Sequence, residues 1–250
     1  MDIPRQEKIS AGAFDLNKFL FGGYETDIIT TIYGPGASGK SNLCLLVAVS
    51  QAKKGNKVIY MDTEGGFSID RVKQFLQGNN EDTEKVLGNI ILLKPTTFEE
   101  QELDFGKLLK NVKKETISLI VIDSIAMLYR LELGDAIQSR EDENIRSVNR
   151  RLANMLKELN EIARKQNIPI IITNQVYSEF QRDRNDQNYQ EEKRVSMVGG
   201  DLLKYWSKCL IELQNNHGKR RLILRKHRSM PEKYLDFEIN NLGIKKRGLF

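Results

Sequence analysis

Apolar residues gather in short β-branched runs along this chain, and stretches with helical spacing separate these runs. Runs of this kind predict strands, here at residues 27–33, 57–62, 89–94, 116–123 and 168–174. The fourth run is almost entirely apolar, as expected for a strand that is covered on both faces. The alternation of strands with helices indicates an α/β domain with a mostly parallel, twisted sheet flanked by helices.

The pattern places two helices, the first over residues 39–54 and the second over residues 144–166. In the second helix, apolar residues recur every three or four positions: Ile145, Val148, Leu152, Met155, Leu159 and Ile162. This spacing predicts a long amphipathic helix.

The last third of the chain has a different pattern. Residues 178–200 are polar and lack apolar periodicity, which predicts a long loop that is either functional or disordered. Beyond the loop, residues 208–214, 220–226 and 234–239 alternate apolar and polar side chains. This period of two predicts an antiparallel β meander at the C-terminal end of the fold.

The composition fits one globular domain over residues 1–250, because 40% of the residues are hydrophobic and 29% are charged. No apolar run is long enough to cross a bilayer, and the N-terminus lacks a secretory signal. Cys44 and Cys209 fall in predicted core elements and are expected to be buried, reduced thiols. These features predict a cytoplasmic protein. The net charge of +5 permits contact with nucleic acid, but its position matters more than its sum.

The sequence GPGASGKS, residues 34–41, follows a predicted strand and precedes a predicted helix. It fits the pattern G-x-x-x-x-G-K-[ST], whose glycines turn backbone N–H groups toward phosphates at a helix N-terminus. We expect Lys40 to reach the β- and γ-phosphates and the Ser41 hydroxyl to ligate Mg²⁺. The predicted nucleotide site comprises the loop and the residue after it: Gly34, Pro35, Gly36, Ala37, Ser38, Gly39, Lys40, Ser41 and Asn42.

Two acids lie where predicted strands end, at the carboxyl edge of the sheet. Asp123 ends the fourth strand, where it either holds magnesium through water or caps the segment that follows. The next residue is Ser124, whereas many P-loop ATPases have a second acid there to activate water. Glu64, just past the second strand, is the candidate base, although most isolated glutamates are surface charges.

Four segments in this order resemble the RecA-type recombinase core, and most closely its archaeal and eukaryotic branch. They are the entry to the phosphate loop at 10–41, DTEGGF at 62–67, LIVIDS at 119–124 and TNQV at 173–176. The similarity extends over about residues 9–239, nearly the whole chain. It implies a RecA-like P-loop NTPase core that binds ATP and Mg²⁺.

The resemblance also implies roles for single residues. Glu64 matches the general base of this branch, and Arg71 matches an arginine that stacks on the adenine ring. Gln175 matches a glutamine that senses the γ-phosphate; otherwise it is an ordinary hydrogen-bonding residue at a strand end. Residues 129–140 and 178–198 correspond to two DNA-binding loops.

The chain departs from full recombinases of this branch in two respects. About ten residues precede the core, which leaves no separate N-terminal DNA-binding domain and no polymerisation motif. Residues 178–198 contain four basic and five acidic residues, whereas a polyanion requires uncompensated positive charge. Phe180 and Tyr189 are able to stack on bases, but exposed loop aromatics often have no such role.

The surplus charge gathers instead at residues 219–228, KRRLILRKHR, with a smaller group at 245–247. The simpler interpretation is a solvated strand pair. The resemblance offers another, because Lys226 and Arg228 match trans-acting fingers of RecA-like ATPases such as KaiC, and the pair is also a feature of the short archaeal RadB family. The two cations would then stabilise the γ-phosphate of a neighbouring subunit.

The short chain and the KHR sequence make RadB the closest match among these families. The match implies an accessory protein of homologous recombination and DNA repair that binds ATP and single-stranded DNA, hydrolyses ATP weakly and assists a main recombinase. Two alternatives stay open: a DNA-dependent ATPase that forms filaments and exchanges strands itself, and a KaiC-like signalling ATPase. A homo-oligomer with nucleotide at its interface is compatible with all three.

Overall fold

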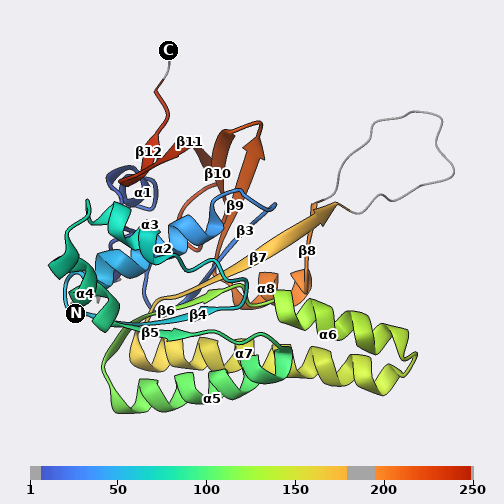
Figure 1. Ribbon diagram of the computed structural model, residues 1–250. Helices are drawn as coiled ribbons and strands as arrows, with labels where there is room; N and C mark the ends of the chain where they lie inside the picture. Colours follow the sequence, from blue (N-terminus) through green and yellow to red (C-terminus); the bar gives the residue numbers. More distant parts are fainter. Residues whose placement is uncertain (1–6, 179–194, 249–250) are drawn as a thin grey trace, which may run out of the picture.

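A computed structural model of the chain describes residues 7–178 and 195–248. One large sheet runs through the molecule, and helices cover both of its faces (Figure 1). Its strands are β3 (Ile29–Gly34), β4 (Lys57–Asp62), β5 (Ile90–Leu93), β6 (Ile117–Asp123), β7 (Ile170–Ser178), β8 (Val195–Met197), β9 (Cys209–Asn216), β10 (Lys219–Lys226), β11 (Lys233–Asn240) and β12 (Gly243–Lys246). A separate antiparallel pair joins β1 (Lys8–Ile9) to β2 (Tyr24–Glu25).

The sheet has a parallel half and an antiparallel half. The strand order is β12-β11-β10-β9-β3-β7-β6-β4-β5, and β8 pairs with β7 outside this path. Strands β3, β4, β5, β6 and β7 pair in parallel along the path, and β9 pairs in parallel with β3. Strands β9 to β12 pair with one another antiparallel. The predicted α/β architecture with a C-terminal meander is confirmed.

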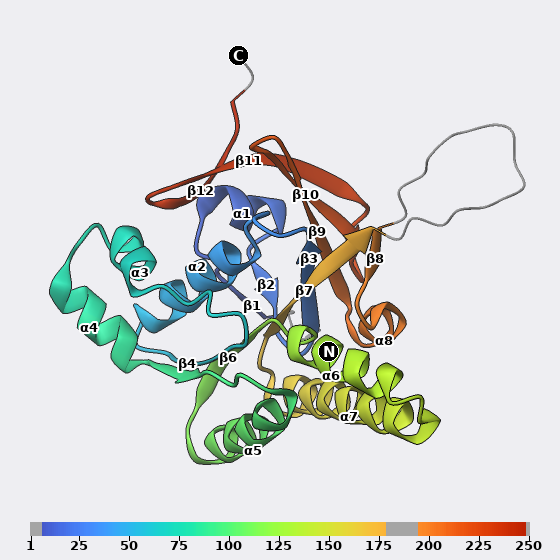
Figure 2. The ribbon, with the colours of Figure 1, turned by 45° about the vertical axis from the view of Figure 1, so that its right-hand side comes forward.

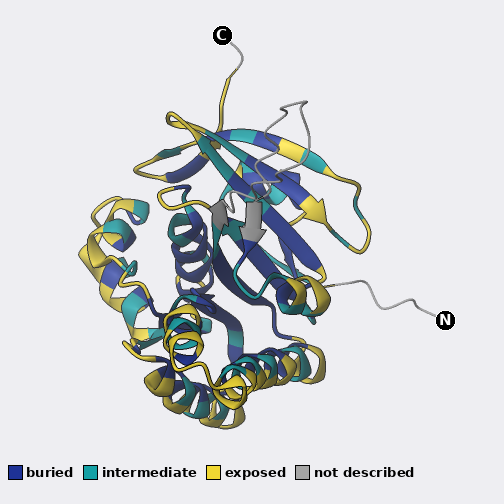
Figure 3. Ribbon diagram, turned by 90° about the vertical axis from the view of Figure 1, so that its right-hand side faces the viewer, coloured by how far each residue is buried: buried dark blue, intermediate teal, exposed yellow. Residues whose placement is uncertain are grey.

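Two sets of helices enclose the sheet. One set shares a core cluster with one face: α1 (Phe14–Phe19), α2 (Lys40–Ala52), α3 (Ile69–Phe75) and α4 (Asn80–Gly88). The other set lies on the opposite face: α5 (Phe98–Lys114), α6 (Met127–Gln138), α7 (Asp142–Gln166) and α8 (Gly200–Trp206). The central strands are buried and the outward faces of the helices are exposed (Figure 3).

The predicted core elements agree closely with the structure. The strand at 57–62 has the predicted bounds, and the long helix begins two residues earlier than predicted. Cys44 and Cys209 are buried and free, as expected. The meander has one more strand than predicted, β12, which pairs with β11 and packs against α1 and α2 (Figure 2). No helix in the described ranges is long and apolar enough to cross a bilayer.

One predicted loop is a helix. Residues 129–138, the greater part of the first predicted DNA-binding loop, belong to α6. Leu128, Tyr129 and Ala136 are buried, and the Tyr129 hydroxyl donates to Asn149 Oδ1 of α7 at 2.6 Å. These contacts stabilise residues 129–138 as a helix packed on α7, so the prediction of a loop was wrong. Most of the second predicted loop, residues 179–194, lies outside the described residues.

Candidate nucleotide-binding site

The phosphate loop connects the end of β3 to the start of α2, and both of its outer glycines are required by the backbone. A Cβ at position 34 would lie 2.3 Å from the carbonyl oxygen of Leu213, so only glycine fits there. Gly39 has a φ of 109°, in the left-handed region that other residues rarely adopt. The turn directs the chain into the N-terminus of α2, where backbone N–H groups favour an anion.

Lys40 is buried beneath the loop that it follows. Its Nζ donates to the carbonyl oxygens of Gly34 at 3.0 Å and Pro35 at 2.9 Å. Burial lowers the pKa of Lys40, and the carboxylates of Glu64 and Asp123 oppose that shift. The ammonium therefore lies in the field of both predicted acids.

Asp123 is the most enclosed acid of the site, with 1% of its surface exposed. Its Oδ2 accepts from the Tyr60 hydroxyl at 3.1 Å, and its Oδ1 accepts from the Thr173 hydroxyl. Burial raises the pKa of Asp123, while the hydroxyls of Thr173, Ser41 and Tyr60 oppose the rise. Hydroxyls from three different elements thus orient this carboxylate.

Ser41 and Asp123 border the same point, next to Gly66. A Cβ on Gly66 would lie 3.0 Å from Ser41 Oγ and 3.7 Å from Asp123 Oδ2. Within the described residues there is no group of three His, Cys, Asp or Glu side chains able to hold a metal. Mg²⁺ is commonly held by one or two protein oxygens together with water and substrate phosphates, and this pair fits that pattern.

The turn that carries Glu64 is fixed by two residues that the sequence analysis did not identify. The Asp62 carboxylate accepts from the backbone N–H groups of Gly66 and Phe67, each at 2.9 Å. The Thr63 hydroxyl donates to the carbonyl of Ser124 and accepts from its N–H, each at 2.8 Å. The turn after β4 is therefore hydrogen-bonded to Ser124, the first residue after β6.

Glu64 and Gln175 meet across the edge of the sheet. Gln175 Nε2 donates to Glu64 Oε2 at 2.8 Å. Gln175 lies on β7 and Glu64 on the turn after β4, with β6 between the two strands. Two residues predicted from separate motifs are thus in direct contact.

Arg71, the predicted adenine-stacking residue, lies beside the first turn of α2. Its Nε donates to Asn42 Oδ1 at 2.8 Å, and its Nη2 donates to the Asn240 carbonyl at 2.7 Å. The guanidinium also lies over the Phe75 ring, 4.3 Å from the centroid. These contacts link the helix after the phosphate loop, α3 and the end of β11.

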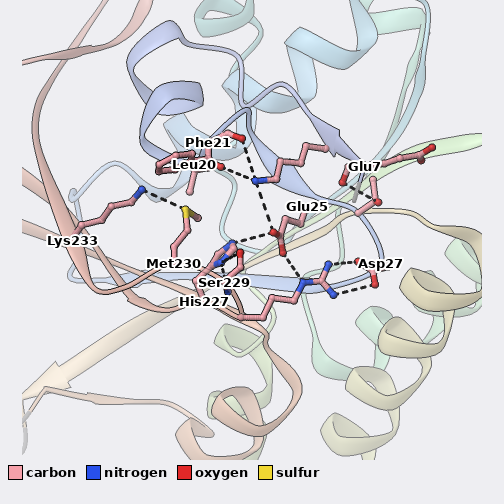
Figure 4. Close-up of polar contacts among 12 residues, drawn as sticks. Glu7, Leu20, Phe21, Glu25, Asp27, His227, Ser229, Met230 and Lys233 are labelled. Atoms are coloured by element: carbon pink, nitrogen blue, oxygen red, sulfur yellow. Dashed lines mark hydrogen bonds and ion pairs between the residues drawn. The ribbon is translucent and has the colours of Figure 1, made fainter. Parts of the chain in front are cut away.

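Lys226 and Arg228 lie at the other end of β3 from the phosphate loop. Arg228 Nε donates to Glu25 at 2.8 Å, and its Nη2 donates to Asp27 at 2.6 Å, just before β3 begins. Figure 4 shows Glu25 and Asp27 with His227, whose ring is 3.5 Å from Glu25. Lys226 Nζ donates to the carbonyl of Lys204 at 2.7 Å. Lys226 and Arg228 therefore do not contact the predicted nucleotide site of their own chain.

Two buried hydroxyls near the loop have no hydrogen-bond partner among the described residues, Ser38 Oγ and Ser124 Oγ. Buried polar atoms are nearly always hydrogen-bonded, so such atoms indicate a place where a polar ligand is able to supply the partner. Ser38 belongs to the loop, and Ser124 follows Asp123. With the lysine, the hydroxyl of Ser41 and the loop amides, the residues fit a nucleoside triphosphate with a hydrated Mg²⁺.

Comparisons with known proteins agree with this geometry. A family model described as Rad51 matches residues 5–247. The chain is 38% identical over 233 residues to a DNA repair and recombination protein RadB of Methanosphaera stadtmanae, covering 92% of both chains. It is 39% identical over 234 residues to a RadB of Methanobrevibacter smithii, again with 92% of both covered. A RadB of Methanocaldococcus jannaschii is 40% identical over 229 residues, 92% of this chain and 98% of its own.

Proposed function

The chain belongs to the Rad51 family, and on that basis we propose that it is an ATP-binding accessory protein of homologous recombination and DNA repair. It binds DNA, preferentially single-stranded, and assists a main recombinase. The observation that carries the proposal is the contact between Glu64 and Gln175, because it links the nucleotide edge to β7. The chain leads directly from β7 into residues 179–194, most of the second predicted DNA-binding loop.

Each residue of the site has a proposed part in handling ATP. The loop amides and Lys40 hold the phosphates, Ser41 and Asp123 hold Mg²⁺, and Arg71 lies against the base. When bound, Mg²⁺ neutralises charge on the phosphate oxygens. Glu64 accepts a proton from the attacking water, and Gln175 keeps its carboxylate at the edge of the sheet. Hydrolysis is proposed to be slow, as the similarity to the RadB family implies.

The proposal predicts that single-stranded DNA binds and that ATP changes its affinity. Anisotropy of a fluorescein-labelled dT 30-mer, with and without Mg²⁺-ATP, measures both effects. We expect binding at 50 mM salt that weakens as salt rises, and an effect of ATP of about fivefold or more, the lower range of coupling energies between sites. Absence of binding at low salt would remove the DNA role and leave a signalling ATPase as the better account. Equal DNA affinity with and without ATP would contradict the proposed effect of ATP.

A contribution of Arg228 to a neighbour's nucleotide predicts an effect that depends on assembly. Arg228→Ala is expected to leave ATP affinity within about threefold of wild type but to lower turnover at high protein concentration by tenfold or more; arginines acting in trans contribute about 10³-fold or more. Arg225→Ala is the matched control, because Arg225 also pairs with two acids, Glu212 and Glu232. Equal turnover of wild type and Arg228→Ala, with light scattering showing the same oligomer, would exclude the trans role.

A further inference from the structure

The meander brings together two basic segments that lie far apart in the sequence. Strand pairing sets Arg220 opposite Phe237, and Phe237 opposite Lys246. In the next row, Arg221 lies opposite Asp236, whose carbonyl accepts from Arg247 N at 2.9 Å. We call this end of the meander the basic corner: Lys219, Arg220, Arg221, Lys245, Lys246 and Arg247.

The basic corner has more positive charge than its acids neutralise. Both carboxylate oxygens of Asp236 accept hydrogen bonds from Arg221, at 2.7 and 3.0 Å. Glu238 lies opposite Lys245 in the strand register. Asp15 accepts from the backbone N of Lys246. Six cations therefore face three acids, and the other five cations of the corner form no ion pair with a carboxylate in the part of the chain that the structure describes.

Several arginines outside the corner each pair with two carboxylates. Arg151 pairs with Glu102 and Glu132, and Arg225 with Glu212 and Glu232. Arg220, in contrast, has a buried Nε without a hydrogen-bond partner among the described residues. A buried guanidinium N–H normally has an acceptor, so a ligand with anionic oxygens would complete this site.

An exposed aromatic ring adjoins the cations. Tyr234 is 62% exposed, and the Arg221 guanidinium lies 4.3 Å from its ring centroid. Cations interleaved with exposed stacking surfaces are the combination that single-stranded nucleic acid requires, since phosphates need charge and unpaired bases need a flat partner.

Two residues next to the corner contact the phosphate loop. Asn215, which lies opposite Arg220, donates from Nδ2 to the carbonyl of Ala37 at 3.2 Å. A Cβ on Gly39 would lie 2.8 Å from Cδ1 of Ile239, which lies on β11. A ligand at the corner therefore lies one side chain away from the loop that is predicted to hold ATP.

We propose that the basic corner binds the sugar-phosphate backbone of single-stranded DNA, separately from the predicted DNA-binding loops. The inference rests on the proposed DNA-binding function and assigns it a surface. Its charges lie on both faces of the sheet at this end of the meander, because Arg220 and Lys246 share one face and Arg221 shares the other with Asp236. A flexible single strand is able to bend around such an end.

The test is a triple neutralisation, Lys219→Gln with Lys245→Gln and Lys246→Gln, titrated against the labelled dT 30-mer at several salt concentrations. All three lysines are exposed, and within the described residues their side chains form no hydrogen bond or ion pair, so the fold should tolerate the change. Each single-strand phosphate contact adds about 0.7 to the magnitude of the slope of log affinity against log salt, so three contacts add about 2. Relative to 1 M salt, a slope of about 2 corresponds to about 100-fold in affinity at 0.1 M salt. We expect losses of that size.

The matched control is Lys110→Gln with Lys113→Gln and Lys114→Gln, three exposed lysines of α5, which lies on the face of the sheet away from α2. It changes the net charge equally and should cost less than threefold in affinity. An equal loss in both triple variants, or no loss in the corner variant, would overturn the assignment while wild-type binding still supported the DNA role. No binding by the wild type would overturn both. Melting temperatures within a few degrees of wild type show that the variants are folded.

Discussion

Lys40→Ala is expected to lower the affinity for ATP by about 100-fold or more. The ammonium is buried among the loop carbonyls and lies in the field of Glu64 and Asp123, and no other cationic side chain of the described residues donates to these carbonyls. Truncating one partner of a desolvated charge pair costs about 2–5 kcal/mol, and about 1.4 kcal/mol corresponds to a tenfold change. Of the single substitutions proposed, this one should have the largest effect on binding.

Isothermal titration with Mg²⁺-ATP measures this loss, and thermal unfolding gives an independent readout. A ligand that binds only the folded state raises its stability, so ATP should raise the melting temperature of wild type but not of the variant. Lys54→Ala is the control, since Lys54 is exposed just beyond the other end of the same helix. Retained ATP affinity in Lys40→Ala would show that residues 34–41 do not hold the triphosphate.

Glu64→Gln is expected to reduce ATP hydrolysis by about 100-fold or more while ATP affinity stays within about threefold of wild type. The substitution keeps the size of the side chain and its ability to accept a hydrogen bond from Gln175, but it removes the group that takes a proton from water. General base catalysis contributes about 10²–10⁴-fold, which sets the expected range. A loss in turnover without a loss in binding distinguishes a catalytic residue from one that shapes the pocket.

Single-turnover measurements with radiolabelled ATP are suited to a slow enzyme. Glu84→Gln, an exposed acid on α4, is the control and should hydrolyse ATP at the wild-type rate. If Gln175 acts through Glu64, Gln175→Ala should lower the rate in the wild type and have no further effect in the Glu64→Gln variant. Wild-type turnover by Glu64→Gln would assign the base to another residue.

The parts of the fold that depend on short stretches of sequence were predictable. The strand at residues 57–62 and the loop at 34–41 are local patterns, in which alternation, glycine positions and flanking elements all agree. Lys40, Ser41 and Asp123 could be placed together because carboxyl ends of parallel strands share one edge. Local signals therefore located the site before the order of the strands was known.

Contacts between strands were not predictable from the pattern. Tyr60 and Thr173 lie in apolar runs, where a polar group gives no sign of its partner until β4, β6 and β7 are known to be adjacent. Asp62 resembled an ordinary strand-end acid, although its carboxylate orders the turn that follows. The family resemblance predicted a loop at residues 129–140, whereas burial of Leu128, Tyr129 and Ala136 against the neighbouring helices stabilises α6 there.

Strand β7 has a consequence beyond the site itself. It supplies the hydroxyl that orients Asp123 and the amide that holds Glu64, and the chain then runs on into residues 179–194. If ATP changes the affinity of that segment for a ligand by some factor, the ligand must change the affinity for ATP by the same factor. A polymer engaged there would act as an effector of the nucleotide pocket, and the size of one effect can be read from the other.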